Sequence, residues 1–432
     1  MASRRGGIEM KLSRKDFLRA GAAAWTAGAF NIVPSTVFGA NAPSNRINMA
    51  LIGCGGQGCG DMGAFLGFDD VVFRAVCDVN KKKAEKAKKT VDDRYKNSDC
   101  KECEDFREVC DRPDIDAIII GTPDHWHAYI GTYALAHGKD CYGEKPLAHD
   151  LSEGRALADA VKKYGRVWQT GSQQRSGDEF RKAVELVRNG RIGKIKRVEV
   201  GLPGGGRGKK ADPNAKIPEG LNWDFWLGPA PERPFLGVYD WDWRWVLDWG
   251  GGQLMDWIGH HCDIAQWGLD RDYSGPVSFK GFAPFEPESG IYDSFKSYHV
   301  ECRYDDGVEL AVASDVRGGC TWFGENGDWI WVNRGALEAS KSSIKESKTE
   351  PGELHLESAG HQRDFIDAIK CRNTTSSDCE IAHRSASVGH LCQIALLTGR
   401  EIKWDPKTEH IIGDKAAEAL LSRAPRGEWK LY

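Results

Sequence analysis

The sequence predicts an α/β protein in which a doubly wound parallel sheet is followed by an α/β domain with an open, mostly antiparallel sheet. Three observations support this prediction. Apolar runs alternate with helical segments across residues 45–173, as in parallel sheets that are covered on both faces. A glycine-rich turn follows the first apolar run. Across residues 174–432, short runs of alternating polar and apolar residues follow one another, which favours antiparallel strands.

In the first domain, each expected strand is an apolar run bounded by turn residues. These runs are residues 47–52, 71–77, 117–121, 139–142 and 167–170. The segments between them have helical periodicity, and helices are expected over residues 81–95, 126–137 and 152–164.

The second domain is expected to begin with a helix over residues 177–189 and a strand over 194–201, followed by a glycine- and proline-rich connector up to residue 220. Further strands are expected over residues 277–282, 297–304, 308–315, 329–332 and 336–339, and helices over 360–371 and 383–399.

Composition and charge exclude several classes of protein. The chain of 432 residues is 41% hydrophobic and 28% charged, which is typical of globular domains. Its formal net charge of −4 gives no reason to expect nucleic acid or an anionic membrane as a partner. Most of the thirteen cysteines stand singly, as buried thiols do, although Cys371 and Cys379 could form a disulfide in an oxidising compartment.

Residues 1–42 are expected to form an export signal. Ser13-Arg14-Lys15-Asp16-Phe17-Leu18 precedes an apolar stretch that is too short to span a bilayer, and small residues follow it up to Ala42. This pattern resembles a twin-arginine signal with Lys15 in place of the second arginine. It predicts a periplasmic or secreted protein, and a cytoplasmic protein with an N-terminal extension is the alternative.

The glycine-rich turn has the form of a dinucleotide-binding motif, which makes the first domain a Rossmann domain. In Gly53-Cys54-Gly55-Gly56-Gln57-Gly58, the first glycine of the motif allows the tight turn and the second lets the backbone approach a pyrophosphate. The third, Gly58, lets the helix pack closely on the strand. Gly56 and Gln57 lie at the expected helix N-terminus, where backbone amides bind phosphate, so both are expected to contact the cofactor.

Asp78 ends the second strand, twenty residues after Gly58, at the position of a ribose-binding carboxylate. A carboxylate there repels a 2′-phosphate, so NAD is the expected cofactor. Lys81 and Lys82 follow closely and leave NADP as the less favoured alternative.

Two further motifs follow buried strands at the edge of the sheet where ligands bind in such folds. Thr122 and Pro123 are expected to line the nicotinamide side, and His127 is expected nearby. A metal pair formed by His125 and His127 is the alternative, but side chains at i and i+2 diverge on a helix, so no metal is expected.

Lys145, in Glu144-Lys145-Pro146, follows the next strand. Hydride transfer from a secondary alcohol requires a group that accepts the hydroxyl proton, and Lys145 could be that group. A Glu-Lys pair on a solvated loop is the alternative.

These motifs, together with Gly250–Asp263, resemble the Gfo/Idh/MocA oxidoreductase family, named after glucose–fructose oxidoreductase and inositol dehydrogenase. The tryptophan-rich segments Asn222–Pro229 and Trp243–Trp245 resemble a secreted, sugar-related branch. The resemblance implies that Lys145, Asp256 and His260 are catalytic and that Glu144 lies by the nicotinamide ribose. It also implies a homo-oligomer formed through the C-terminal sheet.

Asp256 and His260 are four residues apart on an expected helix and should therefore share a face. A carboxylate so placed could fix the tautomer of the histidine, which would move the substrate proton alongside Lys145. Ile258 stands where the family has a glycine.

The substrate is expected to be a carbohydrate or polyol. Eight tryptophans fall between Trp223 and Trp267, and indole rings stack on the C–H faces of sugars, although packing between the domains is the alternative. The residues expected to hold substrate hydroxyls are Gln173, Arg175, Trp243, Arg244 and His261.

The expected activity is NAD-dependent oxidation of a secondary hydroxyl of a sugar, cyclitol or glycoside, with a cofactor that stays tightly bound if the protein is exported. The first alternative is a redox-neutral glycoside hydrolase that oxidises the ring transiently, eliminates the aglycone, adds water and reduces the product. The second is a non-catalytic sugar-binding protein.

Overall fold

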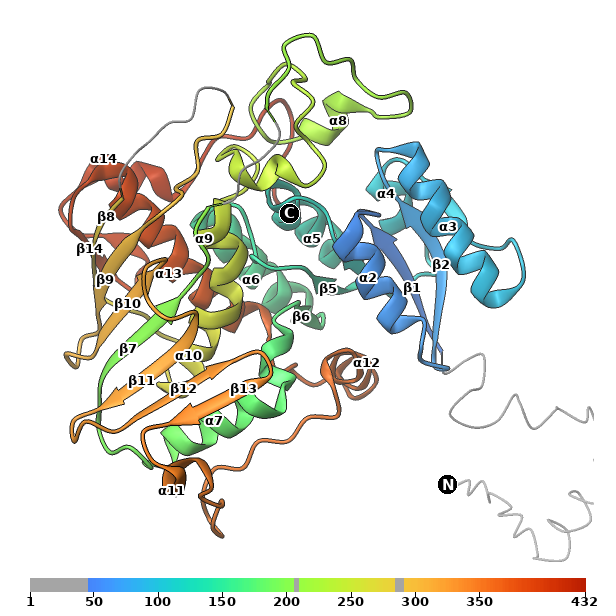
Figure 1. The fold of residues 1–432 in the computed structure, drawn as a ribbon. Helices are drawn as coiled ribbons and strands as arrows, with labels where there is room; N and C mark the ends of the chain where they lie inside the picture. The colour runs from blue at the N-terminus through green and yellow to red at the C-terminus, as the bar shows by residue number, and fades with distance from the viewer. Residues whose placement is uncertain (1–45, 206–209, 284–290) are drawn as a thin grey trace, which may run out of the picture. The chain divides into compact units, whose positions relative to one another are not determined.

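The computed structural model describes residues 46–205, 210–283 and 291–432, drawn as a coloured ribbon in Figure 1. The expected export signal lies outside the described residues, as does part of the glycine-rich connector. Within the described part of the chain, no helix combines the length and the apolar character that crossing a membrane requires.

The N-terminal sheet has six strands, all parallel, in the order β3-β2-β1-β4-β5-β6. The strands are β1 (Ile47–Ile52), β2 (Val71–Cys77), β3 (Lys101–Cys103), β4 (Ala117–Ile120), β5 (Asp140–Gly143) and β6 (Trp168–Thr170). The connecting helices are α2 (Gly56–Phe65), α3 (Lys81–Tyr95), α4 (Phe106–Cys110), α5 (Asp124–Ala136) and α6 (Leu151–Tyr164). Because the strand order reverses between β1 and β4, the carboxyl ends of these two strands flank the crevice where such folds bind ligands.

The second sheet has nine strands in the order β13-β12-β11-β7-β10-β9-β8-β14-β15, and β7 and β10 form its parallel pair. The predicted open, mostly antiparallel sheet is therefore confirmed. Its strands are β7 (Ile195–Gly201), β8 (Ser278–Phe282), β9 (His299–Arg303), β10 (Glu309–Ala313), β11 (Gly319–Gly324), β12 (Trp329–Asn333), β13 (Ala336–Ala339), β14 (Ile402–Asp405) and β15 (His410–Ile411).

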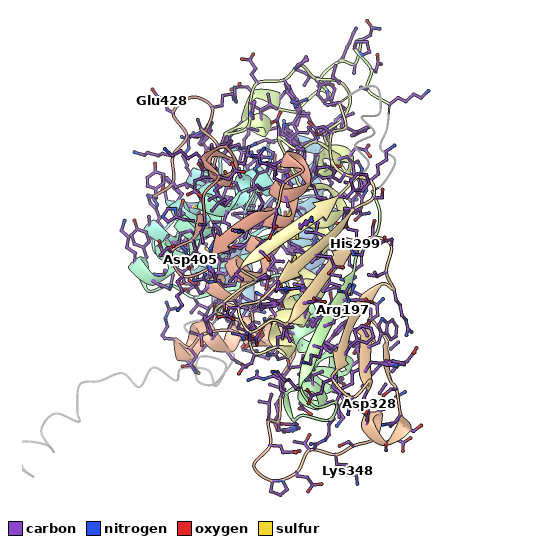
Figure 2. All side chains as sticks on the ribbon, turned by 90° about the vertical axis from the view of Figure 1, so that its left-hand side faces the viewer. Arg197, His299, Asp328, Lys348, Asp405 and Glu428 are labelled. Carbon is purple, nitrogen blue, oxygen red and sulfur yellow. The ribbon has the colours of Figure 1, made fainter. Side chains whose placement is uncertain are left out.

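The two faces of this sheet differ in chemistry. One face packs on α7 (Asp178–Arg188), α10 (Asp263–Gly268) and α13 (Cys379–Thr398), and together they form the largest apolar core. The other face carries charged side chains that pair with one another, as Arg197 does with Glu301 at 2.9 Å and His299 with Asp315 at 2.8 Å. Figure 2 shows Arg197 and His299 on the strands of this sheet.

Two strands were not predicted from the sequence, and one predicted helix begins earlier than expected, each for an identifiable reason. Strand β3 is a short edge strand with exposed polar residues, so it has no apolar run. Strand β11 was not expected because it begins and ends with glycine. Helix α13 begins at Cys379, before the expected residue 383, because the Asp378 side chain caps it by accepting a hydrogen bond from the amide of Ile381.

The long segment between β7 and α9 (Gly252–Trp257) has its own aromatic core. Within the short helix α8 (Trp223–Leu227), Trp223 stacks on Trp226 at 4.8 Å, and Trp249 meets Trp226 edge-on at 4.9 Å. Trp126 of α5 donates a hydrogen bond from its indole N–H to the carbonyl of Trp226, at 3.0 Å. This packing holds the segment against helix α5 of the N-terminal domain, so several of the clustered tryptophans are structural.

All thirteen cysteines are free thiols, Cys371 and Cys379 included.

Candidate active site

A cavity of about 490 Å³ lies at the carboxyl ends of β1 and β4 and extends under the tryptophan-rich segment. The N-terminal domain contributes the glycine turn, Asp78, Thr122, Pro123, Glu144 and Lys145 to its lining. The rest of the chain contributes Gln173, Trp243, Arg244, Asp256 and His260. Most of the residues predicted from the sequence to act in catalysis or binding therefore line one cavity.

The glycine turn has the geometry that a dinucleotide pyrophosphate requires. Gly53 has φ +91°, and a Cβ atom there would lie 2.6 Å from the carbonyl carbon of Gly121, so only glycine fits. A Cβ on Gly58 would lie 2.2 Å from the carbonyl oxygen of Gly53, which confirms that this position serves the close packing of α2 on the sheet. Gly55 and Gly56 line the cavity at the start of α2, whose first amides are free for phosphate.

Alanine at Gly55 and alanine at Gly58 should have different effects. Gly55 has φ −71°, and an added Cβ meets no atom within 4 Å, so G55A should keep its melting temperature. Its NAD affinity should fall about ten-fold, because the methyl group crowds the pyrophosphate. G58A should lose thermal stability through the clash with Gly53. Calorimetric NAD titration and thermal melting of both variants measure these effects, and indistinguishable variants would contradict the assignment.

Asp78 follows β2 directly and lines the same cavity as Lys145. Its carboxylate accepts hydrogen bonds from the amides of Cys54 and Asn80, both at 2.7 Å, which ties the end of β2 to the glycine turn. Burial raises the pKa of Asp78, and these two amides partly offset the rise. Lys83 lines the cavity beside it and is ion-paired with Asp240.

The two lysines named from the sequence in connection with NADP are placed differently. Lys81 and Lys82 are exposed and do not line the cavity. The lysine that reaches it is Lys83, whose charge is balanced by Asp240.

Lys145 lies at the centre of a half-buried charged group. Its Nζ donates to Asp256 Oδ1 at 2.8 Å and to the carbonyl of Asp256 at 3.0 Å. Arg244 contacts the same carboxylate oxygen at 3.4 Å, and its guanidinium lies over the ring of Trp243 at 4.4 Å. Burial alone would raise the pKa of Asp256, but Lys145 and Arg244 outweigh it and the pKa is lowered. Asp256 is therefore an anion that fixes the position of the lysine amine.

His260 faces the cavity but does not pair with Asp256, so the predicted Asp256–His260 contact is wrong. The carboxylate of Asp256 is directed toward Lys145 and Arg244, and His260 lies in a π-helical turn, η5 (Ile258–Cys262), where its Nδ1 is buried without a partner. Burial, then the charges of Lys145 and Arg334, lower the pKa of His260 well below its usual value. The imidazole is therefore neutral and can donate or accept one hydrogen bond toward a ligand.

Ile258, which replaces the family glycine, packs in the apolar core. Its neighbour Gly259 is the residue that approaches the lysine, because a Cβ there would lie 3.1 Å from the Cβ of Lys145. The carbonyl of Gly259 accepts a hydrogen bond from Ser172 at 2.8 Å. The backbone at Gly259 is thus fixed by close packing against Lys145 and by its hydrogen bond from Ser172.

Glu144 belongs to a second acidic pair below Lys145. Gln57 Nε2 donates to Asp61 at 3.1 Å and to Glu144 at 3.4 Å, which links α2 to the end of β5. Burial and the Glu144 carboxylate raise the pKa of Asp61 to about 9. Asp61 is therefore protonated at neutral pH, and burial raises the pKa of Glu144 as well.

Gly58, which serves the packing of α2, does not line the cavity. Three further residues that were expected to contact ligand do not line it either, and these expectations are corrected. His127 is buried, with its ring nitrogens 2.7 Å from the carbonyl of Pro146 and 2.9 Å from that of Thr122. It therefore positions two loops that do line the cavity. Arg175 is buried and paired with Asp263 and Asp272. His261 is buried against Trp257, with Gln174 at 3.3 Å from its Nδ1.

The histidines weighed as a metal pair are held by backbone carbonyls. His125 places its ring nitrogens 3.0 Å from the carbonyl of Trp226 and 3.4 Å from that of Trp249. A group with metal-ligand geometry, His149, Asp150 and Glu153, lies outside the cavity lining.

Several cavity residues were missed from the sequence. They include Asp124, Tyr239, Asp240, Trp241, Trp257 and Arg334. Asp124 at the start of α5 could have been proposed from its place after a buried strand, and burial followed by the charge of Asp256 raises its pKa well above the usual value. Arg334 carries no local signal, because it reaches the cavity from a hairpin turn of the second sheet.

Comparison with known proteins identifies the family. Residues 47–172 match the oxidoreductase family with an NAD-binding Rossmann fold, and residues 186–431 match the C-terminal alpha/beta domain of the same family. Together these matches cover most of the chain. The chain therefore belongs to the Gfo/Idh/MocA oxidoreductase family, and its N-terminal domain is of that family's NAD-binding Rossmann type.

Individual relatives are more distant. The chain is 28% identical over 213 residues to the uncharacterized oxidoreductase YrbE of Bacillus subtilis, covering 49% of this chain and 52% of that protein. It is 26% identical over 207 residues to glycosyl hydrolase family 109 protein 1 of a Shewanella species (strain MR-4), covering 43% and 44%. The chain thus spans about half the length of these curated relatives.

Among solved structures, the aldose–aldose oxidoreductase of Caulobacter crescentus, complexed with glycerol, superposes with a TM-score of 0.62 at 18% identity. The match covers 83% of this chain and 99% of that one, and it shows the shared fold.

Proposed function

We propose that this protein oxidises a secondary hydroxyl of a sugar, cyclitol or glycoside by hydride transfer to NAD. The observation that carries the proposal is the Lys145–Asp256 pair, at 2.8 Å, in the same cavity as the glycine turn. The names of the relatives support a carbohydrate substrate, since they include an aldose–aldose oxidoreductase and a glycosyl hydrolase.

The residues of this chain divide the work between binding and proton transfer. Bound NAD would lie along the glycine turn, with Asp78 toward the adenosine ribose and Glu144 toward the nicotinamide ribose, and it would supply the hydride acceptor. Asp256 holds the Lys145 amine beside the substrate hydroxyl, where the amine in its neutral form accepts the proton. His260 and Gln173 orient the neighbouring hydroxyls, and Trp243 and Trp257 line the space that the ring would occupy.

The test is to supply purified protein with NAD and a set of aldoses, cyclitols and glycosides. NADH should form with at least one of them, and its rate should depend on substrate concentration. Failure of every member to reduce either NAD or NADP would contradict the proposal.

We further propose that NAD is preferred over NADP, because Asp78 supplies negative charge and Lys83 is already paired with Asp240. Asp78→Asn removes the charge at constant size. Its ratio of NAD to NADP affinity should fall about ten-fold or more, since a charge-assisted hydrogen bond to ribose is lost. Asp69→Asn, on the loop before β2, serves as the control. An unchanged ratio in D78N would show that Asp78 does not select the cofactor.

The glycosyl hydrolase relative favours a second candidate, redox-neutral hydrolysis with a resident cofactor. That activity would release the aglycone from a nitrophenyl glycoside without added NAD and without net NADH. Denatured protein would then release stoichiometric nucleotide, identifiable by mass. Stoichiometric NADH with no aglycone release would favour the dehydrogenase.

Three expectations remain predictions. They are export, the division into domains near residue 173, and self-association through the charged outer face of the second sheet.

A further inference from the structure

A hairpin turn places Arg334 at the substrate end of the cavity, the part that is lined by Lys145, Asp256, Trp257 and His260. Arg334 and Gly335 connect β12 to β13, and Gly335 has φ +73°. The amide of Gly335 donates to Glu179 at 2.8 Å, and the side chain of Asn333 accepts from the amide of Arg334 at 2.7 Å. The turn is therefore anchored to α7, and the position of Arg334 is built into the fold.

The guanidinium of Arg334 has an aromatic neighbour, but it has no counter-ion within the part of the chain that the structure describes. It lies over the ring of Trp257 at 4.8 Å, and Trp257 in turn meets His260 edge-on at 5.6 Å. Among the described residues, none places a carboxylate within 4.0 Å of it. By contrast, Arg244 in the same cavity contacts Asp256.

The substrate end of the cavity consequently carries excess positive charge. Arg244 and Arg334 are guanidinium cations, and Asp256 is the anion that Arg244 shares with Lys145, so the charge of Arg334 is left unbalanced even when the Lys145 amine is neutral. His260 is neutral because its pKa is lowered well below its usual value, and burial raises the pKa of Asp124, which favours its uncharged form. A neutral sugar would leave this charge uncompensated, whereas an anionic one would balance it.

We propose that the natural substrate is a sugar acid whose carboxylate is bound by Arg334, with the ring against Trp257 and the reacting hydroxyl at Lys145. This inference rests on the proposed function and names its substrate class. The planar fork of a guanidinium pairs with a carboxylate through two parallel hydrogen bonds, and stacking on an indole orients the fork. Uronic acids, aldonic acids and glycosides of uronic acids have the required chemistry.

The kinetic test compares a neutral sugar, the corresponding uronate and the corresponding sugar phosphate. The wild type should have its highest kcat/KM with the uronate. In R334M the ratio of kcat/KM for the uronate to kcat/KM for the neutral sugar should fall about ten- to hundred-fold. The ratio for R334K should lie between those of the wild type and R334M, because lysine keeps the charge but lacks the planar guanidinium. R317M is the matched control, because Arg317 lies over Trp331 at 3.4 Å and pairs with Glu338 but does not line the cavity.

Equal losses with both sugars in R334M, or a preference for the phosphate, would overturn the proposal. Direct binding separates it from the proposed function: calorimetry of the NAD-loaded protein with glucuronate and galacturonate should show binding to the wild type that R334M weakens at least ten-fold. If no sugar reduces NAD but this difference is observed, the oxidoreductase proposal fails and the carboxylate site stands. If neither uronate binds and none is turned over, the carboxylate site is wrong.

Discussion

Replacement of Lys145 by methionine is expected to lower kcat by a factor of about 10²–10⁴, the range attributed to general acid–base catalysis. The reason is geometric: the Lys145 amine is held at 2.8 Å from Asp256 and faces the cavity that contains the glycine turn. Methionine keeps the length and apolar stem of the side chain but cannot accept a proton. Steady-state kinetics with the best substrate of the panel measure the effect.

The control for this variant must separate chemistry from binding and folding. NAD affinity, measured by calorimetry, should stay within about three-fold of wild type, because Lys145 lies beyond the pyrophosphate site. Lys162→Met removes an exposed lysine that pairs with Glu380 outside the cavity, and it should leave kcat unchanged. If the K145M enzyme kept its full kcat, the proposal that Lys145 accepts the substrate proton would be contradicted.

Replacement of Arg175 by alanine is expected to destabilise the protein by about 3–5 kcal/mol, the usual cost of breaking a buried ion pair. Arg175 is 3% exposed and donates to Asp263 at 2.6 and 2.8 Å and to Asp272 at 2.7 Å. Asp263 is itself buried, so the variant would leave an uncompensated charge in the core. Denaturant titration measures the free energy of unfolding.

The matched comparison is Arg317→Ala, which breaks an exposed pair with Glu338 and should cost no more than about 1 kcal/mol. The fraction of R175A that remains folded should have the same KM as the wild type, because the Arg175 side chain does not line the cavity. A raised KM with unchanged stability would restore Arg175 as a substrate-binding residue.

The order and type of the main elements could be predicted because periodicity is local. Strands β1 and β2 and helix α3 have the predicted bounds, since an apolar run or a stripe with clear ends defines each of them. The glycine turn could also be predicted from the sequence. Only glycine fits at Gly53 and Gly58, so the turn requires glycines at a fixed spacing in the chain.

The partners of polar side chains in the site could not be predicted in the same way. Asp256 and His260 have the spacing of residues on one helix face. The carboxylate of Asp256 nevertheless accepts its hydrogen bond from Lys145, which is more than a hundred residues away in the chain. Arg175 has the chemistry of a substrate clamp, but tertiary packing places it between two buried aspartates. Arg334 depends on the pairing of β12 with β13 and on its anchor to Glu179.

The central claim is that Lys145 and the glycine turn serve one bound dinucleotide. A crystal structure of the protein with NAD tests it most directly. The pyrophosphate should lie on the amides of Gly55 and Gly56, the adenosine ribose at Asp78, and the nicotinamide ring beside Lys145 and Glu144. A nicotinamide ring outside the cavity, or a Lys145 amine that points away from it, would contradict the account.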